Sequence, residues 1–444
     1  MQNLNRIVFF VVIGCLWGVQ SEAFVVKARA GKTRKTSCIV SIEGKDELIR
    51  HLGRVIAFDM DFSGQFKTSL NHDISKRSDK NYHKALFEKG IDLCVYLLDL
   101  SFEGRKRVGL EVVQTWLGKK VYSKTVNLKT EKAIKHGHSI SEKLLLALTG
   151  KKGICCSTLA WCEGDKVVCS DYAGMQSSEV VRSPGMKFAP SFHTKAPLLF
   201  FSHATDRNSE LSSIDLSTGR QRVRFSYPGL TMQFAFSPDG TKGITCMSGS
   251  RGNTELYLYD QALCNSLGKQ AFTQLTKNNG ANVSPCFLSN GDVIFCSDYQ
   301  TGRNGRPQLY YLDAKTKKTV RLTSGIGYCA APSYCEKNKK VVFNKPINGV
   351  FQLFCLSLKD FDVTTFKDGI GLPIKQLTFG GQDKTEPQWH PEGDFVAFMQ
   401  SARGQKTARK AQVAIFSAVD GAVRVITQSA TGRGFPAWTD RTLY

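Results

Sequence analysis

The stretch that decides the fold is PQWHPEGDFVAF, residues 387–398. It joins a Pro-x-aromatic phrase to a turn that contains Pro and Gly, and the turn leads into a short apolar run. Pro fixes φ and Gly tolerates a positive φ, so the middle of the stretch predicts a tight turn between two strands. The apolar run, with its Phe and Val residues, is typical of a buried strand.

Phrases of this kind recur six times in the second half of the chain. Each has an aromatic two positions after a residue that is usually Pro: Pro190–Phe192, Phe234–Phe236, Pro285–Phe287, Pro332–Tyr334, Pro387–Trp389 and Pro436–Trp438. Successive aromatics at the ends of the phrases lie 44, 51, 47, 55 and 49 residues apart. A period of about fifty residues, with strand-like content inside each repeat, is typical of propeller blades.

The number of repeats predicts how the ring closes. Five full units, each with four strand-like runs, occupy about residues 187–427, and an incomplete unit lies at 158–181. The last phrase, Gly434–Trp438, has no strands after it. Because a closed ring leaves no long unpaired edge, this terminal strand is predicted to complete the first unit. The sequence therefore predicts an all-β propeller of six blades over residues 151–444, closed by the C-terminal strand.

The first 36 residues have the composition of targeting and linking segments. Residues 1–23 carry one Arg, an apolar run and small residues before Ala23, which predicts a signal peptide cleaved after Ala23. Lipid attachment at Cys15 remains an alternative. Residues 24–36 hold five Lys or Arg and no acid, so they are predicted to form a flexible basic arm.

Residues 37–150 alternate between strand and helix patterns. Strands are expected at Cys38–Ile42 and Leu93–Leu98, and helices at 45–58, 78–89 and 139–148. The length and the mixture predict an α+β N-terminal domain in front of the propeller.

The fourteen Cys of the chain do not form a metal-binding pattern. Cys155, Cys156, Cys162 and Cys169 lie close together in sequence, but their spacing lacks the paired CxxC arrangement of structural zinc, so no metal is expected. A disulfide within this cluster stays open. Most other Cys fall in predicted strands, where Cys acts as a small buried hydrophobe.

The net charge of +22 is spread over both halves of the chain. A nucleic-acid-binding protein concentrates its charge beside stacking aromatics or in a known module, and here the aromatics occupy core positions of the repeat. No nucleic-acid partner is expected. For an exported basic protein, the charge favours anionic lipid, cell-wall polymer or an acidic partner.

Candidate catalytic residues are scarce. Gly137–Ser141 begins like a nucleophile elbow but lacks the closing Gly, and helix N-capping by Ser139 explains it better. His136 and His138 are too close in sequence to share a helix face, and structural or surface roles are expected for them. The sequence therefore predicts a binding protein without cofactors rather than an enzyme.

Three local matches, together with the predicted architecture, resemble the TolB family, the periplasmic propellers of the Tol-Pal envelope system. They are Leu86–Asp92, Leu148–Gly153 at the domain junction and Phe435–Trp438 at the end. The resemblance implies a periplasmic, non-enzymatic adaptor that is peripheral to the membrane. It implies binding of the peptidoglycan-associated lipoprotein Pal through the propeller and of a TolA-like inner-membrane protein through residues 24–36, in support of outer-membrane integrity and cell division.

The resemblance also implies a binding surface in the loops before the Pro-x-aromatic strands. Carried onto this chain, these loops are Met186–Ala189, Leu230–Gln233, Asn282–Ser284, Tyr328–Ala331, Lys384–Glu386 and Arg433–Phe435. The contacts expected within them are Gln233, Val283, Ser284, Tyr328, Thr385 and Glu386. Thr385-Glu386-Pro387 keeps the polar phrase of the family.

Two functions of other classes remain as alternatives. One is a hydrolase or lyase that works in the propeller channel, which requires several carboxylates or His residues to converge there. The other is a structural module that binds the cell wall directly through its positive charge.

Overall fold

The N-terminal domain is a mixed sheet covered by helices. The computed structural model describes residues 34–444 apart from 130–131, 207, 249–251, 261–271, 302–304, 369–370, 403–410 and 428–433, so the expected signal peptide and nearly all of the basic arm lie outside the described residues. The sheet has the order β2-β1-β3-β4-β5. Its strands are β1 Thr36–Ile42, β2 Phe66–Asn71, β3 Leu93–Asp99, β4 Arg107–Gln114 and β5 Lys119–Asn127. β1 runs parallel to β2 and β3, whereas β4 and β5 continue as antiparallel hairpins.

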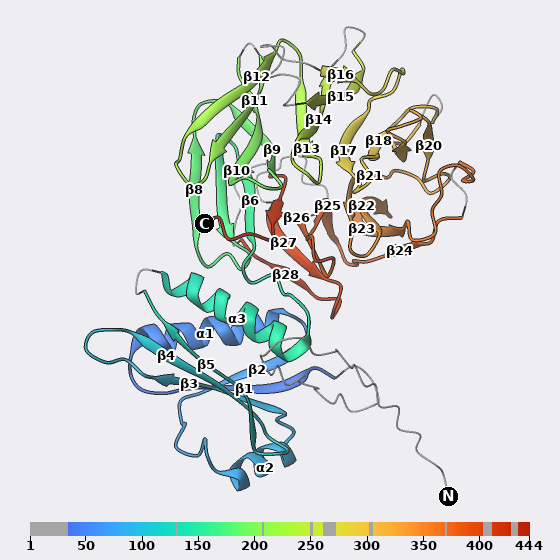
Figure 1. The fold of residues 1–444 in the computed structure, drawn as a ribbon. Helices are drawn as coiled ribbons and strands as arrows, with labels where there is room; N and C mark the ends of the chain where they lie inside the picture. The colour runs from blue at the N-terminus through green and yellow to red at the C-terminus, as the bar shows by residue number, and fades with distance from the viewer. Residues whose placement is uncertain are drawn as a thin grey trace, which may run out of the picture.

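The described helices cover both faces of this sheet. α1 (Glu47–Phe62) and α3 (Ala133–Thr149) lie between the sheet and the propeller, and α2 (Lys80–Glu88) lies on the far side (Figure 1). α1 begins where the Asp46 side chain accepts hydrogen bonds from the N–H groups of Leu48 and Ile49, a standard N-cap. Among its buried residues, Ile49, Leu52, Ile56 and Met60 recur every three or four positions and share a core cluster with residues of β1 and β3.

Helix α3 begins earlier than the sequence predicts. The helix begins at Ala133, six residues before Ser139, so Ser139 is not its N-cap and Gly137–Ser141 lies inside the helix. Ser141 instead bonds the carbonyl of Gly137 within the helix at 3.0 Å. The helix ends at Gly150, whose φ of 70° is a left-handed conformation that suits glycine.

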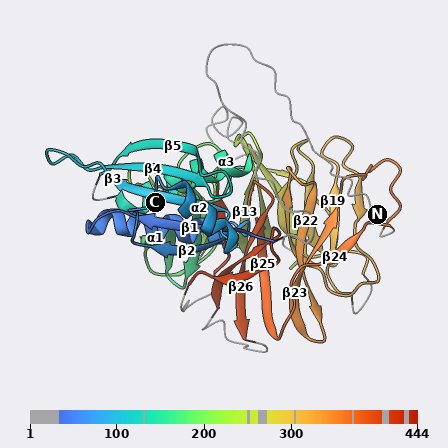
Figure 2. The ribbon, with the colours of Figure 1, turned by 90° about the horizontal axis from the view of Figure 1, so that it is seen from below.

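The rest of the described chain is a propeller of six four-stranded sheets, as the repeats predict (Figures 1 and 2). Five of the sheets follow one another along the chain, and in each the innermost strand comes first. The first two consist of β9 Met186–Phe192, β10 Leu198–Ala204, β11 Ser209–Asp215 and β12 Gln221–Tyr227, and of β13 Thr231–Phe236, β14 Lys242–Ser248, β15 Thr254–Asp260 and β16 Phe272–Gln274. The next three consist of β17 Val283–Phe287, β18 Val293–Ser297, β19 Gln308–Leu312 and β20 Thr319–Arg321; of β21 Ala330–Cys335, β22 Lys340–Ile347, β23 Val350–Ser357 and β24 Ile374–Gln376; and of β25 Gln382–Trp389, β26 Phe395–Ala402, β27 Gln412–Ser417 and β28 Val423–Val425.

The sixth sheet joins the two ends of the propeller. It has the order β29-β6-β7-β8, with β6 Thr158–Glu163, β7 Lys166–Asp171, β8 Ser177–Arg182 and β29 Ala437–Thr439. Trp438 lies opposite Leu159 in the antiparallel pairing of β29 with β6. The C-terminal strand therefore closes the ring, which confirms the prediction from the repeats.

The cysteines behave as core residues. All twelve that the structure describes have free thiols, and ten of them are buried. Cys155, Cys156, Cys162 and Cys169 are among the free ones, so the disulfide left open for this cluster does not form.

A buried polar cluster connects the two halves of the molecule. Asp59 of α1 accepts a hydrogen bond of 2.6 Å from the Tyr172 hydroxyl and lies 2.9 Å from Nδ1 of His138 on α3. Tyr172 belongs to the turn between β7 and β8, so the cluster bridges the N-terminal domain and the ring-closing blade. All three side chains are fully buried. Around them, the ring of Phe62 packs edge-on against Tyr172 at 4.9 Å.

Candidate partner-binding site

A channel of about 260 Å³ runs where the innermost strands of the blades meet. The six Pro-x-aromatic phrases all contribute to its wall. Each phrase lies at the innermost strand of its blade, which is β9, β13, β17, β21, β25 or β29. This position explains why the phrases line the channel.

Five of these strands contain the same backbone irregularity. One residue directly before the phrase has a positive φ of 50–57° in each: Ala189, Gln233, Ser284, Ala331 and Glu386. The pairing with the neighbouring strand shifts register at all five positions, as a β-bulge does. None of the five is glycine, so each pays for a left-handed conformation with about 1–2 kcal/mol of strain. All five line the channel, and strain of this kind concentrates at functional sites.

The structure brings three of the six expected contact residues to the channel wall. These are Gln233, Ser284 and Glu386. Val283 precedes Ser284 but packs against the core between blades, Thr385 is half-buried in β25, and Tyr328 packs edge-on against Phe351 at 5.5 Å. One aspect of the expectation was wrong: five of the six lie inside strands rather than loops, because each inner strand continues through its bulge.

Several other residues of the expected loops were not predicted as contacts. Ala189 and Ala331 occupy the same bulge position as Gln233, and their place directly before the Pro of the phrase was the signal that could have singled them out. Lys187 and Lys384 each lie three residues before the Pro of their own phrase, and both side chains are buried. The Lys187 ammonium donates to the carbonyls of Pro184 at 3.0 Å and Gly185 at 2.9 Å, and Lys384 donates to Phe379 and Gln382. These lysines fix the connections that enter β9 and β25.

The channel wall carries polar groups that are buried and lack a partner among the described residues. They are the side-chain carbonyl oxygen of Gln233 and the indole N–H groups of Trp389 and Trp438. Unpaired buried polar atoms are uncommon in folded proteins.

Glu386 brings a carboxyl group into this environment. It faces the channel and keeps part of its surface accessible, yet protein atoms surround the group. Burial raises the pKa of Glu386 to about 8. Near neutral pH the side chain is therefore mostly protonated and can donate as well as accept a hydrogen bond.

The N-terminal domain leaves open the end of the channel at which the connections enter the innermost strands. Two contacts reach the turns that join the third and fourth strands of two blades. Lys35, at the end of the predicted basic arm and directly before β1, pairs with Asp420 at 2.8 Å, and Asp59 of α1 accepts a hydrogen bond from Tyr172. The connections that enter the innermost strands emerge on the opposite face, because antiparallel strands alternate in direction. Viewed from the side of the N-terminal domain, β22–β24 also lie clear of it (Figure 2).

Comparison with known proteins identifies the family. The family model described as the TolB beta propeller domain matches residues 146–371, half of the chain. The chain belongs to the TolB family. The curated Tol-Pal system protein TolB of Francisella tularensis subsp. mediasiatica is 25% identical over 290 residues. That alignment covers 62% of this chain and 62% of the length of the relative.

Solved structures agree with the fold. The crystal structure of TolB from Acinetobacter baumannii superposes with a TM-score of 0.74 at 21% identity, covering 91% of this chain and 96% of that one. The hydrazine synthase of Kuenenia stuttgartiensis also contains a similar region, with a TM-score of 0.51 at 12% identity, and covers 65% of this chain and 47% of its own. Because a protein with the name of an enzyme shares this architecture, the propeller alone does not decide function.

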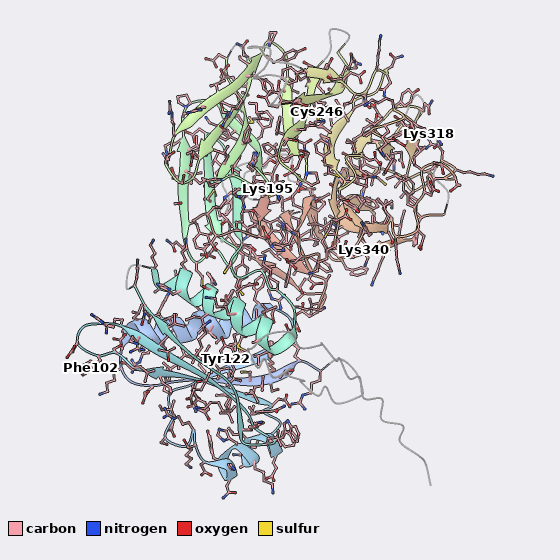
Figure 3. The ribbon with its side chains drawn as sticks, in the orientation of Figure 1. Phe102, Tyr122, Lys195, Cys246, Lys318 and Lys340 are labelled. Carbon is pink, nitrogen blue, oxygen red and sulfur yellow. The ribbon has the colours of Figure 1, made fainter. Side chains whose placement is uncertain are left out.

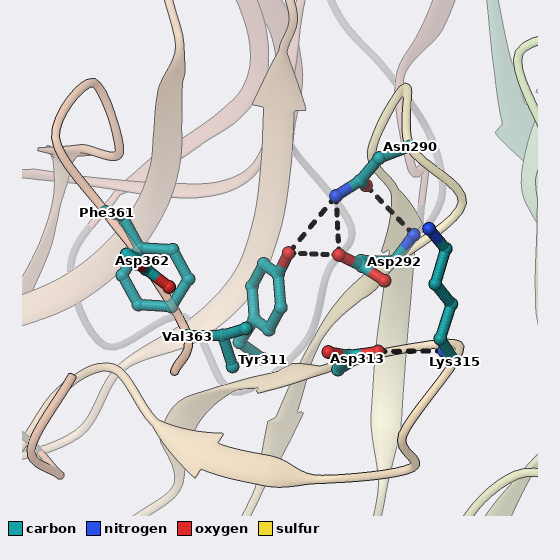
Figure 4. Close-up of a pocket in the computed structure, with 8 residues that line it drawn as sticks. All are labelled: Asn290, Asp292, Tyr311, Asp313, Lys315, Phe361, Asp362 and Val363. Carbon is teal, nitrogen blue, oxygen red and sulfur yellow. Dashed lines mark hydrogen bonds between the residues drawn. The ribbon is translucent and has the colours of Figure 1, made fainter. Parts of the chain in front are cut away.

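A second hollow, of about 330 Å³, lies among the segments that follow β17, β19 and β23 of the propeller (Figure 4). Asp292 accepts hydrogen bonds there from Asn290, at 2.5 Å, and from the Tyr311 hydroxyl. Asp313 and Asp362 accept from backbone N–H groups of their own turns. The carboxylates of this hollow are thus engaged in shaping the turns around it.

The raised pKa of Glu386 predicts a pH dependence of stability. In the unfolded chain this carboxyl ionises near 4.5, whereas in the folded channel it holds its proton to about pH 8. Between these values the folded state binds more protons, so its stability should fall as pH rises, by at most about 1.4 kcal/mol per pH unit. Glu386→Gln should remove this slope in urea titrations between pH 5 and pH 8. Glu103→Gln, at an exposed turn, is the control, and an unchanged slope in Glu386→Gln would contradict the assignment.

Proposed function

We propose that the chain is a non-enzymatic adaptor of the Tol-Pal system that docks a Pal-like, peptidoglycan-associated lipoprotein over the open end of the propeller channel. The observation that carries the proposal is the ring of five strained bulge residues around the channel, on the face that the N-terminal domain leaves free. Membership in the TolB family supports the assignment to the Tol-Pal system.

The composition of the channel wall supports binding rather than catalysis. Among the described residues that line the channel, Glu386 is the only one with a carboxyl group and none is a histidine. Hydrolases and lyases of the class considered above need a second acid or base near the first. The described residues also contain no cluster of three His, Cys, Asp or Glu that could hold a metal ion.

The remaining parts of the proposal concern location and the second partner. We infer export to the periplasm by residues 1–23, a TolA-like partner for residues 24–36, an N-terminal domain over 37–150 and a propeller over 151–444. The composition of the two leading segments supports these assignments. Among the described residues, no helix combines the length and apolarity that a membrane crossing requires. In this role the protein supports outer-membrane integrity and cell division.

The geometry is suited to a compact partner. The channel mouth is a rigid rim made by strand ends, so a folded lipoprotein domain can dock with little rearrangement and bury about 800 Å² on each side. A few central residues dominate most interfaces of this size. Glu386 and Gln233 are the central polar candidates here, with Thr385, Ser284, Val283 and Tyr328 around them.

The charge at position 386 tests the site. Because the Glu386 carboxyl is mostly protonated near neutral pH, Glu386→Gln should bind a soluble Pal-like lipoprotein domain within about threefold of the parent protein at pH 7. Glu386→Lys places a cation in the same buried position and should weaken binding at least tenfold, because leaving a charge unpaired at an interface is costly. Isothermal titration calorimetry measures both, and thermal melting identifies variants that lose binding by unfolding.

The controls distinguish this surface from others. Gln233→Ala and Tyr328→Ala should each weaken binding with the fold intact. If all three of Glu386→Lys, Gln233→Ala and Tyr328→Ala bind as the parent does, the lipoprotein docks elsewhere. Sedimentation with purified peptidoglycan in the absence of the lipoprotein would instead favour direct cell-wall binding, and turnover that a single channel substitution abolishes would favour an enzyme.

A further inference from the structure

The turn between β4 and β5 presents two large apolar side chains to solvent. Trp116 is 43% exposed and Leu117 is 48% exposed. The turn is held firmly, because the hydroxyl of the buried Thr115 donates to the carbonyl oxygens of Ile91, at 2.6 Å, and Asp92, at 2.9 Å. Trp116 and Leu117 are therefore displayed by a fixed structure.

Helix α2 lies beside this turn. A Cβ added to Gly118 would come within 3.1–3.3 Å of atoms of Lys80, the first residue of the helix. The inner side of α2 is anchored to the sheet, where the Nε2 atom of His83 lies 3.0 Å from the Tyr96 hydroxyl. Its outer side is consequently turned to solvent next to Trp116.

This outer side is surrounded by exposed lysines. Lys80 and Lys84 on α2, Lys76 before it and Lys119 after the turn are all exposed, and none of them forms an ion pair with a described residue. Two carboxylates lie in the same region and offset part of the charge: Asp79 caps α2 by accepting from the N–H groups of Asn81 and Tyr82, and Asp73 accepts from the Ser75 N–H. The four lysines still outnumber these two acids. We call Trp116, Leu117, Lys76, Lys80, Lys84 and Lys119 the Trp116 patch.

We propose that the Trp116 patch binds the surface of an anionic phospholipid bilayer. Trp is favoured at the boundary between headgroups and hydrocarbon, and Leu adds an apolar anchor beside it. Lysines around such an anchor are attracted by the negative surface potential of anionic lipid. A folded protein partner is the less favoured occupant, because the patch is a convex turn with cations around it rather than a groove.

The position of the patch is compatible with the function proposed above, on whose periplasmic location this inference rests. α2 lies at the end of the molecule that is farthest from the propeller (Figure 1). Contact with a bilayer through the patch would leave the channel mouth free for the lipoprotein.

Co-sedimentation with vesicles tests the proposal. The probe is the chain without residues 1–23, mixed with vesicles of phosphatidylglycerol and phosphatidylcholine in a one-to-two ratio or of phosphatidylcholine alone. Binding should require the anionic lipid and weaken as salt rises. The charge-reversal variant Lys80→Glu/Lys84→Glu/Lys119→Glu should lose at least tenfold in affinity, and Trp116→Ala/Leu117→Ala about fivefold or more.

Matched variants show whether the effect is local. Lys315→Glu/Lys317→Glu/Lys375→Glu changes the net charge equally on exposed propeller lysines, and Phe102→Ala removes an aromatic that is 71% exposed at the opposite end of the sheet (Figure 3). Both should bind within about twofold of the parent. If either control loses as much as the patch variants, or if the parent does not distinguish the two vesicles, the proposal is wrong.

A spectroscopic readout separates contact from general attraction. Brominated phospholipid should quench tryptophan fluorescence of the parent, and Trp116→Phe should abolish most of that quenching. Because the patch lies away from the channel, its variants should bind the lipoprotein domain normally. Failure of the vesicle experiment would therefore leave the lipoprotein site intact, and failure of lipoprotein binding would leave the patch intact.

Discussion

Removal of residues 434–444 should unfold the propeller as a whole. The deletion takes away β29, leaves the edge of β6 unpaired, and removes Trp438, which is only 8% exposed. Truncation of a core Trp costs about 3–5 kcal/mol by itself. The tail beyond β29 adds further ties, since the Arg441 guanidinium donates to the carbonyl of Lys195 at 2.7 Å and Thr158 donates to the carbonyl of Arg441.

Circular dichroism melting measures this effect. The truncated chain should lose the cooperative transition of the intact protein or show it many degrees lower. Trp438→Ala should show a smaller shift in the same direction, while Trp116→Ala, which removes an exposed Trp, should melt close to the parent. A truncated chain that melts like the intact one would mean that ring closure contributes nothing to stability.

Replacing Asp59 should separate the two halves of the molecule. Asp59→Ala leaves the buried Tyr172 hydroxyl and the Nδ1 atom of His138 without their acceptor. Removing one partner of a buried charged pair destabilises proteins by about 3–5 kcal/mol. We expect two calorimetric transitions in place of one, together with faster proteolysis at the connection between the domains near residues 150–157.

The matched control is Asp61→Ala, two residues farther along α1. A single transition near the parent temperature is expected for this control. If Asp59→Ala also melts as one unit near the parent temperature, the buried cluster does not couple the domains.

The same cluster should respond to pH. Burial lowers the pKa of His138, but the hydrogen bond and the charge of Asp59 outweigh it and raise the pKa above its usual value. Because the pKa of His138 is higher in the folded state than in the unfolded chain, its contribution to stability is fully present below pH 6.5. This contribution is lost as the pH rises through the pKa of the folded state. Burial also raises the pKa of Asp171, whose carboxyl oxygen lies 3.9 Å from Nε2 of His138. This shift, like that of His138, makes the folded state more stable at lower pH. The junction should thus be tighter in mildly acidic solution.

Local sequence determined the blades. Each Pro-x-aromatic phrase joins a turn to a buried strand, and these preferences act over fewer than about fifteen residues. The count of phrases then predicted six blades and closure by the last of them, because a closed ring avoids an open edge. Of the candidate site, Gln233, Ser284 and Glu386 were predicted from the resemblance to the TolB family, and each lies directly before the phrase.

The tertiary structure alone decided the bulges, the buried cluster and the Trp116 patch. Whether Glu386 takes a left-handed conformation depends on how neighbouring inner strands meet around the channel, and sequence offset does not contain that information. His138 lies 79 residues after Asp59 in the chain, and Tyr172 lies 113 residues after it. Only the packing of α1 against α3 and the first blade brings the three side chains together. The α3 boundary failed for the same reason: the helix is extended through Ala133–His138 by what it buries, which outweighs weak local capping signals. Sequence fixes what depends on neighbours in the chain, and the fold decides what depends on residues that meet only after it has formed.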